Sequence, residues 1–145
     1  MAEGAGQTDY KFVVILNKKI DAGVILNAAA HMAASITARA NDEQRLQMKF
    51  SDYIDADGGI HPVSALSLVV LKADNSNQIG KARQAAVEKK LLFVDFTESM
   101  TKNTYVEQMA ATQKLKESEL EYWGLCLFGK KEDIDGITGK FSLWR

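Results

Sequence analysis

The chain has 145 residues, 46% of them hydrophobic, with 18 basic and 19 acidic residues and a formal net charge of −1. This length suits a single domain with a core of its own. The balanced charge excludes a global basic field that would attract nucleic acid or anionic lipid, although a local basic patch stays open. A single cysteine, Cys126, excludes an internal disulfide framework and favours a reducing compartment.

The first ten residues are small and polar and predict a flexible lead-in to a single domain over residues 11–145. This start lacks the basic, apolar-cored pattern of a secretory signal. No apolar run is long enough to span a membrane. We therefore expect a cytoplasmic protein with no membrane partner and no strong binding of nucleic acid.

The chain then begins with an apolar strand, Lys11–Leu16. Its apolar residues are continuous rather than alternating, which is typical of a strand covered on both faces. A short charged turn follows and ends at Asp21, which is expected to cap the next helix through its carboxylate.

That helix is expected over Ala22–Ala40 and contains seven alanines between positions 22 and 38. Its large apolar residues spread round the axis, which predicts a largely buried helix. Asn27, His31 and Ser35 are spaced four apart and form one polar stripe along it.

The rest of the chain alternates between strand and helix patterns. Strands are expected over residues 49–54, 66–72, 91–96 and 123–129, helices over 76–90, 105–115 and 131–137, a turn at 55–59, and a closing strand or docked tail over 141–144. This alternation predicts a three-layer α/β/α fold with a small mixed, mostly parallel sheet and helices on both faces.

Ligands in such folds bind beyond the carboxyl ends of the strands. Two strand ends qualify, at Leu16 and at Asp95, and their loops are expected to meet over the start of the first long helix. Asp95 ends an apolar strand, where a carboxylate is costly to bury unless it is bonded. It is a candidate base or a group that orients one; alternatively it caps the Thr97 loop or pairs with a lysine.

The remaining chemical candidates each have a structural alternative. His31 is either a general acid or base or a core histidine with one hydrogen bond. Lys18 and Lys19 hold a phosphate at the mouth of the site or belong to a solvated turn. Cys126 lies in an apolar run and is expected to be a small core residue rather than a nucleophile.

Several familiar motifs are absent from the sequence. It has no nucleophile-elbow serine, no Walker loop and no G-x-G-x-x-G fingerprint. The two histidines and the cysteine do not have metal-ligand spacing. We expect neither a metal nor a cofactor.

The layout resembles the type II peptidyl-tRNA hydrolases. These begin with a lysine-led apolar strand, a glycine-containing turn and an Ala-rich helix with a histidine, as Lys11–Leu16, Gly23 and Ala28-Ala29-Ala30-His31 do here. Their third strand ends in an aspartate before a threonine-containing loop, as Asp95 does with Thr97 or Thr101. The tail Ile137-Thr138-Gly139-Lys140-Phe141-Ser142-Leu143 is the most specific match, and the resemblance covers residues 11–144.

Two positions depart from that family. The second turn lysine falls on Val24, and the arginine of the loop after the third strand is replaced, with an acid, Glu98, appearing there. Both changes remove positive charge where an RNA phosphate would sit. The chain is more similar to an uncharacterised bacterial family that shares this fold and has no assigned activity.

The resemblance implies hydrolysis of an ester or amide bond through an activated water, on a small-molecule or tRNA-linked substrate. Asp95 or His31 would act as base. Lys18, Lys19 and Thr97 would hold the developing charge, and Asn27 and Thr101 would also bind the substrate.

Two other functions stay open. One is a non-catalytic module that binds a small molecule in the same pocket. The other is a homodimer whose contact surface is marked by three aromatic residues expected to be exposed, Tyr122, Trp123 and Trp144.

Overall fold

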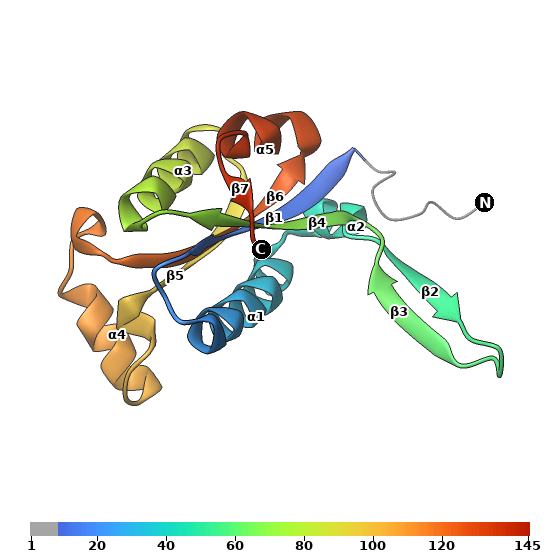
Figure 1. Ribbon diagram of the computed structural model, residues 1–145, viewed down its shortest axis with the longest axis horizontal. Coiled ribbons are helices and arrows are strands. Elements are labelled where there is room, and N and C mark those ends of the chain that lie inside the picture. The colour runs from blue at the N-terminus through green and yellow to red at the C-terminus, as the bar shows by residue number, and fades with distance from the viewer. Residues whose placement is uncertain (1–8) are drawn as a thin grey trace.

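The structure is a computed structural model that describes residues 9–145; most of the expected lead-in, residues 1–8, lies outside the described residues. Figure 1 shows a central sheet with helices above and below it and one hairpin that stands away from the body. The elements are β1 (Tyr10–Asn17), α1 (Ala22–Arg39), α2 (Asp42–Gln47), β2 (Phe50–Ile54), β3 (Ile60–Ser64), β4 (Ser67–Ala73), α3 (Ser76–Glu88), β5 (Leu92–Thr97), α4 (Tyr105–Gln113), β6 (Tyr122–Lys130), α5 (Lys131–Thr138) and β7 (Ser142–Leu143).

The main sheet has five strands in the order β5-β6-β1-β4-β7. Strand β1 pairs parallel with β4, and the other three strand pairings of this sheet, as far as the described residues show it, are antiparallel. The expectation of a mostly parallel sheet is therefore wrong, whereas the mixed α/β class is confirmed. The reason lies in α4, which does not cross over the sheet: β5 and β6 on either side of it are antiparallel neighbours, a connection that needs no crossover helix.

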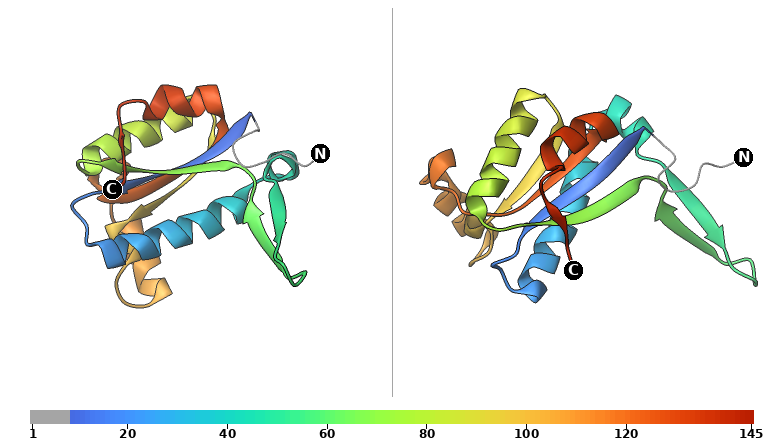
Figure 2. Two further views of the ribbon diagram at one scale, coloured as in Figure 1. Left: turned by 45° about the vertical axis from the view of Figure 1, so that its right-hand side comes forward. Right: turned by 45° about the horizontal axis from the view of Figure 1, so that its top comes forward.

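Helices cover both faces of this sheet, as the sequence predicts (Figure 2). Alternate residues of β1 point to opposite sides: Val13 and Ile15 pack in the core beneath α3 and α5, whereas Phe12, Val14 and Leu16 pack in the core beneath α1. All five are at least 92% buried because their relative exposures run from 0% to 8%. A strand buried on both faces explains the continuous apolar run.

Helix α1 is less buried than its composition suggests. Its buried residues are Ile25, Ala28, Met32 and Ile36, one stripe with helical spacing. Most of its alanines face solvent, so the prediction of a largely buried helix is wrong. Asp21 does occupy the N-cap position, but its side chain accepts no hydrogen bond from the first turn.

Strands β2 and β3 form a separate two-stranded sheet that projects from the body (Figure 1). The expected strand over 49–54 is thus present, but it does not join the main sheet. The turn at 55–59 is confirmed, and the Asp55 carboxylate accepts hydrogen bonds from the backbone N–H groups of Asp57 and Gly59 at 2.9 and 2.8 Å. Gly58 has a φ of +84°, which glycine adopts without strain.

Candidate functional site

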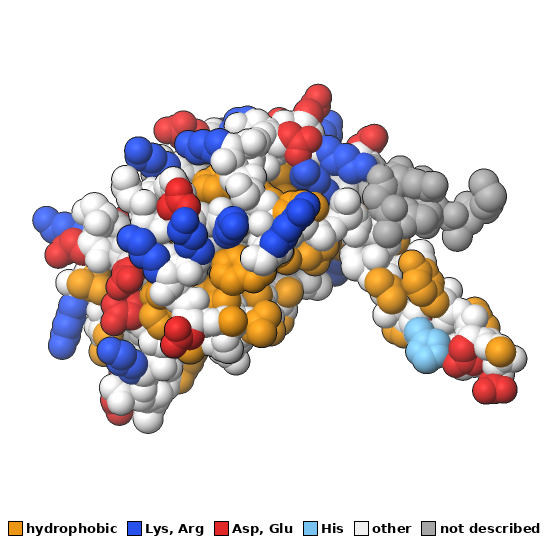
Figure 3. Space-filling model, viewed as in Figure 1, with side chains coloured by type: hydrophobic (Ala, Val, Ile, Leu, Met, Phe, Trp, Pro, Cys, Tyr) orange, Lys and Arg blue, Asp and Glu red, His pale blue; other side chains and the backbone are white. Residues whose placement is uncertain are grey.

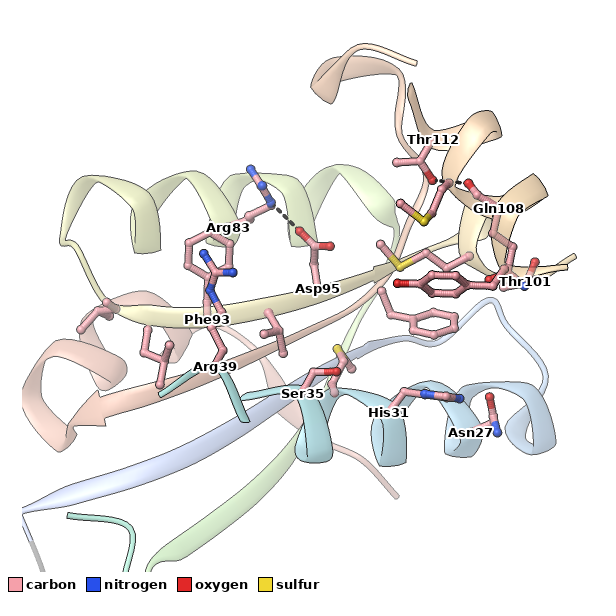
Figure 4. Close-up of a pocket in the computed structure, with 18 of the residues that line it drawn as sticks. Asn27, His31, Ser35, Arg39, Arg83, Phe93, Asp95, Thr101, Gln108 and Thr112 are labelled. Atoms are coloured by element: carbon pink, nitrogen blue, oxygen red, sulfur yellow. Dashed lines mark hydrogen bonds and ion pairs between the residues drawn. The ribbon is translucent and has the colours of Figure 1, made fainter. Parts of the chain in front are cut away.

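A groove of about 1450 Å³ runs between α1, β5 and α4. Figure 4 shows its walls: the side chains of Asn27, His31, Ser35 and Arg39 project from α1 on one side, and α4 stands on the other. Residues 91–96, which include most of β5, form the floor. This volume exceeds the about 300–1,000 Å³ of ordinary small-molecule pockets, so the groove has room for a larger ligand.

The floor of the groove is the outer edge of the sheet. Strand β5 is the terminal strand and pairs with β6 on one side alone. Along such an edge, every second residue turns its backbone N–H and C=O away from the neighbouring strand. The groove therefore offers main-chain hydrogen-bonding groups along its length, which the strand expected at 91–96 did not by itself reveal.

His31 lies in this groove with its side chain exposed rather than in the core. Its ring packs at a tilt against Phe96, with 5.9 Å between the ring centroids. Phe96 in turn lies 6.4 Å from the ring of Trp123. The buried indole nitrogen Nε1 of Trp123 has no hydrogen-bond partner within the described part of the chain.

Asp95 is held by an arginine. The Nε of Arg83, on α3, donates to Oδ2 of Asp95 at 2.7 Å, and its Nη1 donates to Oε1 of Glu117 at 2.7 Å. The guanidinium lies over the Phe93 ring, 5.1 Å from its centroid. Burial by itself lowers the pKa of Arg83, but the hydrogen bond and the charge of Asp95 outweigh it, and the net shift is upward. The ion-pair alternative for Asp95 is thus realised with an arginine instead of a lysine.

A chain of hydroxyl groups anchors α4 beside the groove. Thr97 is completely buried, and its Oγ1 lies 2.8 Å from Oγ of Ser99, which lies 2.8 Å from Oγ1 of Thr112. Thr112 donates to the carbonyl oxygen of Gln108 at 2.8 Å. Thr97 therefore has a structural role inside the fold. Thr101, in contrast, lines the groove and donates its hydroxyl hydrogen to the Glu98 carbonyl at 2.6 Å.

Lys18 and Lys19 are not among the residues that line the groove. Nζ of Lys18 lies 2.8 Å from Oδ1 of Asp74, and the hydrogen bond and charge of Lys18 lower the pKa of Asp74. The turn is fixed by Asn17, which is 2% exposed, donates Nδ2 to the Tyr122 carbonyl at 3.1 Å and accepts the Lys19 N–H at 3.0 Å. The expected meeting of the two strand-end loops over α1 is replaced by a groove along the sheet edge.

The cations of the groove are Arg39, Lys90 and Arg83. Arg39 and Lys90 have no ion-pair partner among residues 9–145. The sequence does contain a signal for Arg39, because it continues the four-residue spacing of Asn27, His31 and Ser35. Lys90 could not be found in this way, since it lies in a turn two residues before β5, where its backbone is left-handed (φ 56°).

Cys126 agrees with the expectation of a small core residue. Cys126 is 1% exposed, and burial raises the pKa of its thiol to about 12, which removes it as a nucleophile at neutral pH. Among residues 9–145, no three His, Cys, Asp or Glu side chains are arranged to hold a metal ion.

Comparison with known proteins places the chain in a family. A family model described as "Protein of unknown function (DUF2000)" matches residues 10–145, nearly the whole chain. The chain belongs to the DUF2000 family. A solved structure of a protein of unknown function from Agrobacterium tumefaciens strain C58 is similar to this DUF2000 protein, with a TM-score of 0.79 and 20% sequence identity over 96% of this chain and 100% of that chain.

These matches establish the family and the fold of this DUF2000 protein. No curated protein matches it. The descriptions of the family and of the Agrobacterium protein name no activity, so the expected similarity to an uncharacterised family is supported and the peptidyl-tRNA hydrolase resemblance stays a proposal. No helix of the described residues is long and apolar enough to cross a membrane.

Proposed function

We propose that this DUF2000 protein binds an extended chain, such as a peptide segment, along the edge of β5. The observation that carries the proposal is the unpaired edge of β5 on the floor of the groove, between α1 and α4. Added strands bind such edges through main-chain hydrogen bonds, and side pockets between the walls supply selectivity. The groove walls are mainly apolar beside β5, with Leu92, Val94 and Met109 among them.

One end of the groove favours an anionic terminus. Arg39 ends α1 near Phe93 (Figure 4), and Lys90 lies two residues before β5, so both cations flank the same end of the strand. A free carboxylate or a phosphate on the ligand would supply the missing negative charge. Hydrogen-bond groups of Asn27 and Thr101 lie toward the other end.

A labelled peptide tests this proposal. The probe is a fluorescent hexapeptide rich in valine and threonine with a free C-terminal carboxylate, and binding is followed by fluorescence anisotropy. Ser35→Tyr fills the groove, whereas Ala34→Tyr adds the same bulk to an exposed position of α1 outside it. We expect saturable binding that Ser35→Tyr weakens at least about tenfold and Ala34→Tyr leaves unchanged. No binding by the native protein, or equal binding by both variants, would contradict the proposal.

A second candidate is hydrolysis of an ester or amide bond, which the accessible imidazole of His31 favours. In this version His31 takes a proton from a water whose oxygen attacks the carbonyl carbon of the bound ligand. The bond from that carbon to the leaving oxygen or nitrogen breaks, and the leaving group receives the proton. Asn27 and Thr101 would position the substrate, whereas Asp95, which pairs with Arg83 on the other face of β5, would not act on the same water.

Peptidyl-tRNA is the substrate to try first for this candidate. Release of free tRNA is measured with the native protein, His31→Ala and Asp95→Ala. Turnover that His31→Ala abolishes without unfolding the chain would support hydrolysis. No release at high protein concentration, or full activity in both variants, would leave binding without chemistry as the function of the groove.

A homodimer and a cytoplasmic location also stay proposals. The aromatic residues expected to mark a dimer surface do not do so: Tyr122 is 5% exposed, and Trp123 and Trp144 are half-buried against the core beneath α1. A dimer would have to use another part of the molecule.

A further inference from the structure

The β2–β3 hairpin carries its apolar side chains in solvent. All five residues of β3 and four of the five in β2 are exposed. Directly opposed residues share a face of an antiparallel pair, so Phe50, Ile54, Ile60 and Pro62 lie on one face, which also carries Asp52 and Ser64. The first three are 68%, 61% and 63% exposed. Isolated two-stranded hairpins are marginal in water, and contiguous exposed apolar groups mark contact surfaces.

The main sheet also has an uncovered part on the α1 side. Helix α1 packs mainly across β6 and β5 and less extensively on β1, and β4 is not among the strands on which it packs closely. On that face of β4, Leu68 is 48% exposed and Val70 is half-buried, with Trp144 beside it. The other face of β4 is covered by α3 and α5. One helix is too narrow to cover five strands, and the uncovered apolar surface needs a further element.

The flank of α1 that adjoins this surface is apolar as well. Leu26 is 65% exposed, and Ala30 and Ala33 lie exposed along the same side, opposite the side that carries His31. Figure 3 shows apolar side chains gathered on the body around the C-terminal strand and α1, and again on the hairpin, with a gap between the two groups.

We propose that a second copy of this chain fills this gap, so that each hairpin covers the uncovered part of the partner's sheet. A two-fold axis between the hairpin and α1 would place each Ile54–Ile60 pair on the partner's Leu68 and Leu26. Such an interface is self-complementary. The two unpartnered surfaces lie on the same side of each chain, so the hairpin of each copy can cover the exposed sheet of the other. The inference is independent of the groove, which lies on the opposite flank of α1.

The exposed area fits an interface between two copies. Apolar groups make up rather more than half of a typical interface, and five large, partly exposed apolar side chains supply such a surface on each copy. Stable interfaces bury about 800 Å² per partner. The five are Leu26, Phe50, Ile54, Ile60 and Leu68, with exposures from 48% to 68%.

Charge also favours a second copy. The turn of the hairpin carries Asp55 and Asp57, and the hairpin starts near the C-terminal end of α1 (Figure 1). A two-fold axis between the hairpin and α1 sets that end beside the start of the partner's α1, where Lys19 and Lys18, the latter also paired with Asp74, lie. The acidic turn would then face two lysines of the partner.

Sedimentation equilibrium of the full chain tests the inference. The native protein is compared with Ile54→Ser/Ile60→Ser on the hairpin, Leu68→Ser on the sheet, and Val106→Ser, a 74% exposed control on α4. All these positions are exposed at the surface, so the fold is expected to persist, which circular dichroism verifies. We expect the mass of two chains for the native protein and for Val106→Ser, and the mass of one chain for the other two at the same concentration.

Two results would overturn the inference. One is a native protein with the mass of a single chain at the highest soluble concentration. The other is a dimer that survives both the hairpin and the sheet substitutions. Because Ser35→Tyr blocks the groove without touching this surface, its dimer mass should match the native value, and peptide binding should survive Ile54→Ser/Ile60→Ser. Failure of the dimer is thereby separable from failure of the groove proposal.

Discussion

His31 and Asp95 line one groove from opposite faces of the sheet. Successive residues of a strand point to opposite sides, and Phe96, next to Asp95, packs on His31 while Asp95 turns to Arg83 on α3 (Figure 4). The two side chains therefore do not form a base and its orienting carboxylate. Hydrolysis, if it occurs, depends on His31 without that partner, whereas Asp95 contributes to stability through Arg83.

Removal of the Asp95 carboxylate should destabilise the fold. The side chains of Arg83 and Asp95 are 20% and 17% exposed, so Asp95→Ala leaves a mostly buried guanidinium with a single partner, Glu117. We expect a loss of about 2–3 kcal/mol in the free energy of unfolding, measured in urea. Glu117→Gln is the control, because Glu117 is 61% exposed and should contribute less than about 1 kcal/mol. Equal effects of the two changes would contradict this account.

The hydroxyl chain beside the groove predicts a local effect on α4. Thr97→Val keeps the shape of a fully buried side chain but breaks its contact with Ser99, and so with Thr112. We expect about 1 kcal/mol of destabilisation and faster amide hydrogen exchange in α4. Thr37→Val, which removes an exposed hydroxyl bonded within α1, should leave α4 exchange unchanged. Unaltered protection of α4 in Thr97→Val would show that other contacts hold the helix.

The approach of α1 to the sheet depends on a glycine. A Cβ at Gly124 would lie 2.5 Å from Cε of Met32 and 3.3 Å from Cδ2 of Leu16, both of them buried. We expect Gly124→Ala to cost about 1–2 kcal/mol because Met32 must move. At Gly23, in the first turn of α1, a Cβ meets no atom within 4 Å. Gly23→Ala should therefore stabilise the fold by roughly 0.5 kcal/mol. In thermal unfolding, the melting temperature should fall for Gly124→Ala and rise for Gly23→Ala.

The turn of the hairpin should respond to acid. His61 Nε2 lies 2.7 Å from Oδ2 of Asp55, and this hydrogen bond, followed by those from Gly59 and Asp57, lowers the pKa of Asp55. Because the pKa of Asp55 is lower in the folded state than in the unfolded state, its carboxylate stabilises the turn fully at pH values above the unfolded-state pKa. This stabilisation is lost as the pH falls through the folded-state pKa. A carboxyl NMR titration should give Asp55 a midpoint below the ordinary aspartate value. His61→Ala should raise that midpoint; an unchanged midpoint would contradict the assignment.

Local sequence patterns predict much of this fold. The continuous apolar run of β1 predicts burial on both faces, and Ile25, Ala28, Met32 and Ile36 are buried where helical spacing places them. The start of α3 follows its cap, Asn75, which accepts the Gln78 N–H at 3.0 Å. These features depend on neighbours in the chain, which is why the sequence is sufficient to predict them.

The features that depend on distant pairing could not be predicted in this way. The antiparallel pairing of β6 with β1 joins residues more than a hundred positions apart, and no pattern within either strand reports its direction. The alanines of α1 fit a buried helix and an exposed one equally well. The Arg83–Asp95 pair joins α3 to β5, so it can be recognised only when the positions of both elements in the fold are known.

Amide hydrogen exchange along β5 tests the central claim most directly. The protein is labelled with ¹⁵N, and the exchange of residues 92–97 is compared with and without the valine- and threonine-rich hexapeptide. The account predicts that alternate amides of β5 slow markedly with the peptide bound, because an added strand pairs with those N–H groups, and that Ser35→Tyr abolishes the effect. Exchange along β5 that the peptide leaves unchanged at saturation would contradict the claim that this sheet edge is the functional site.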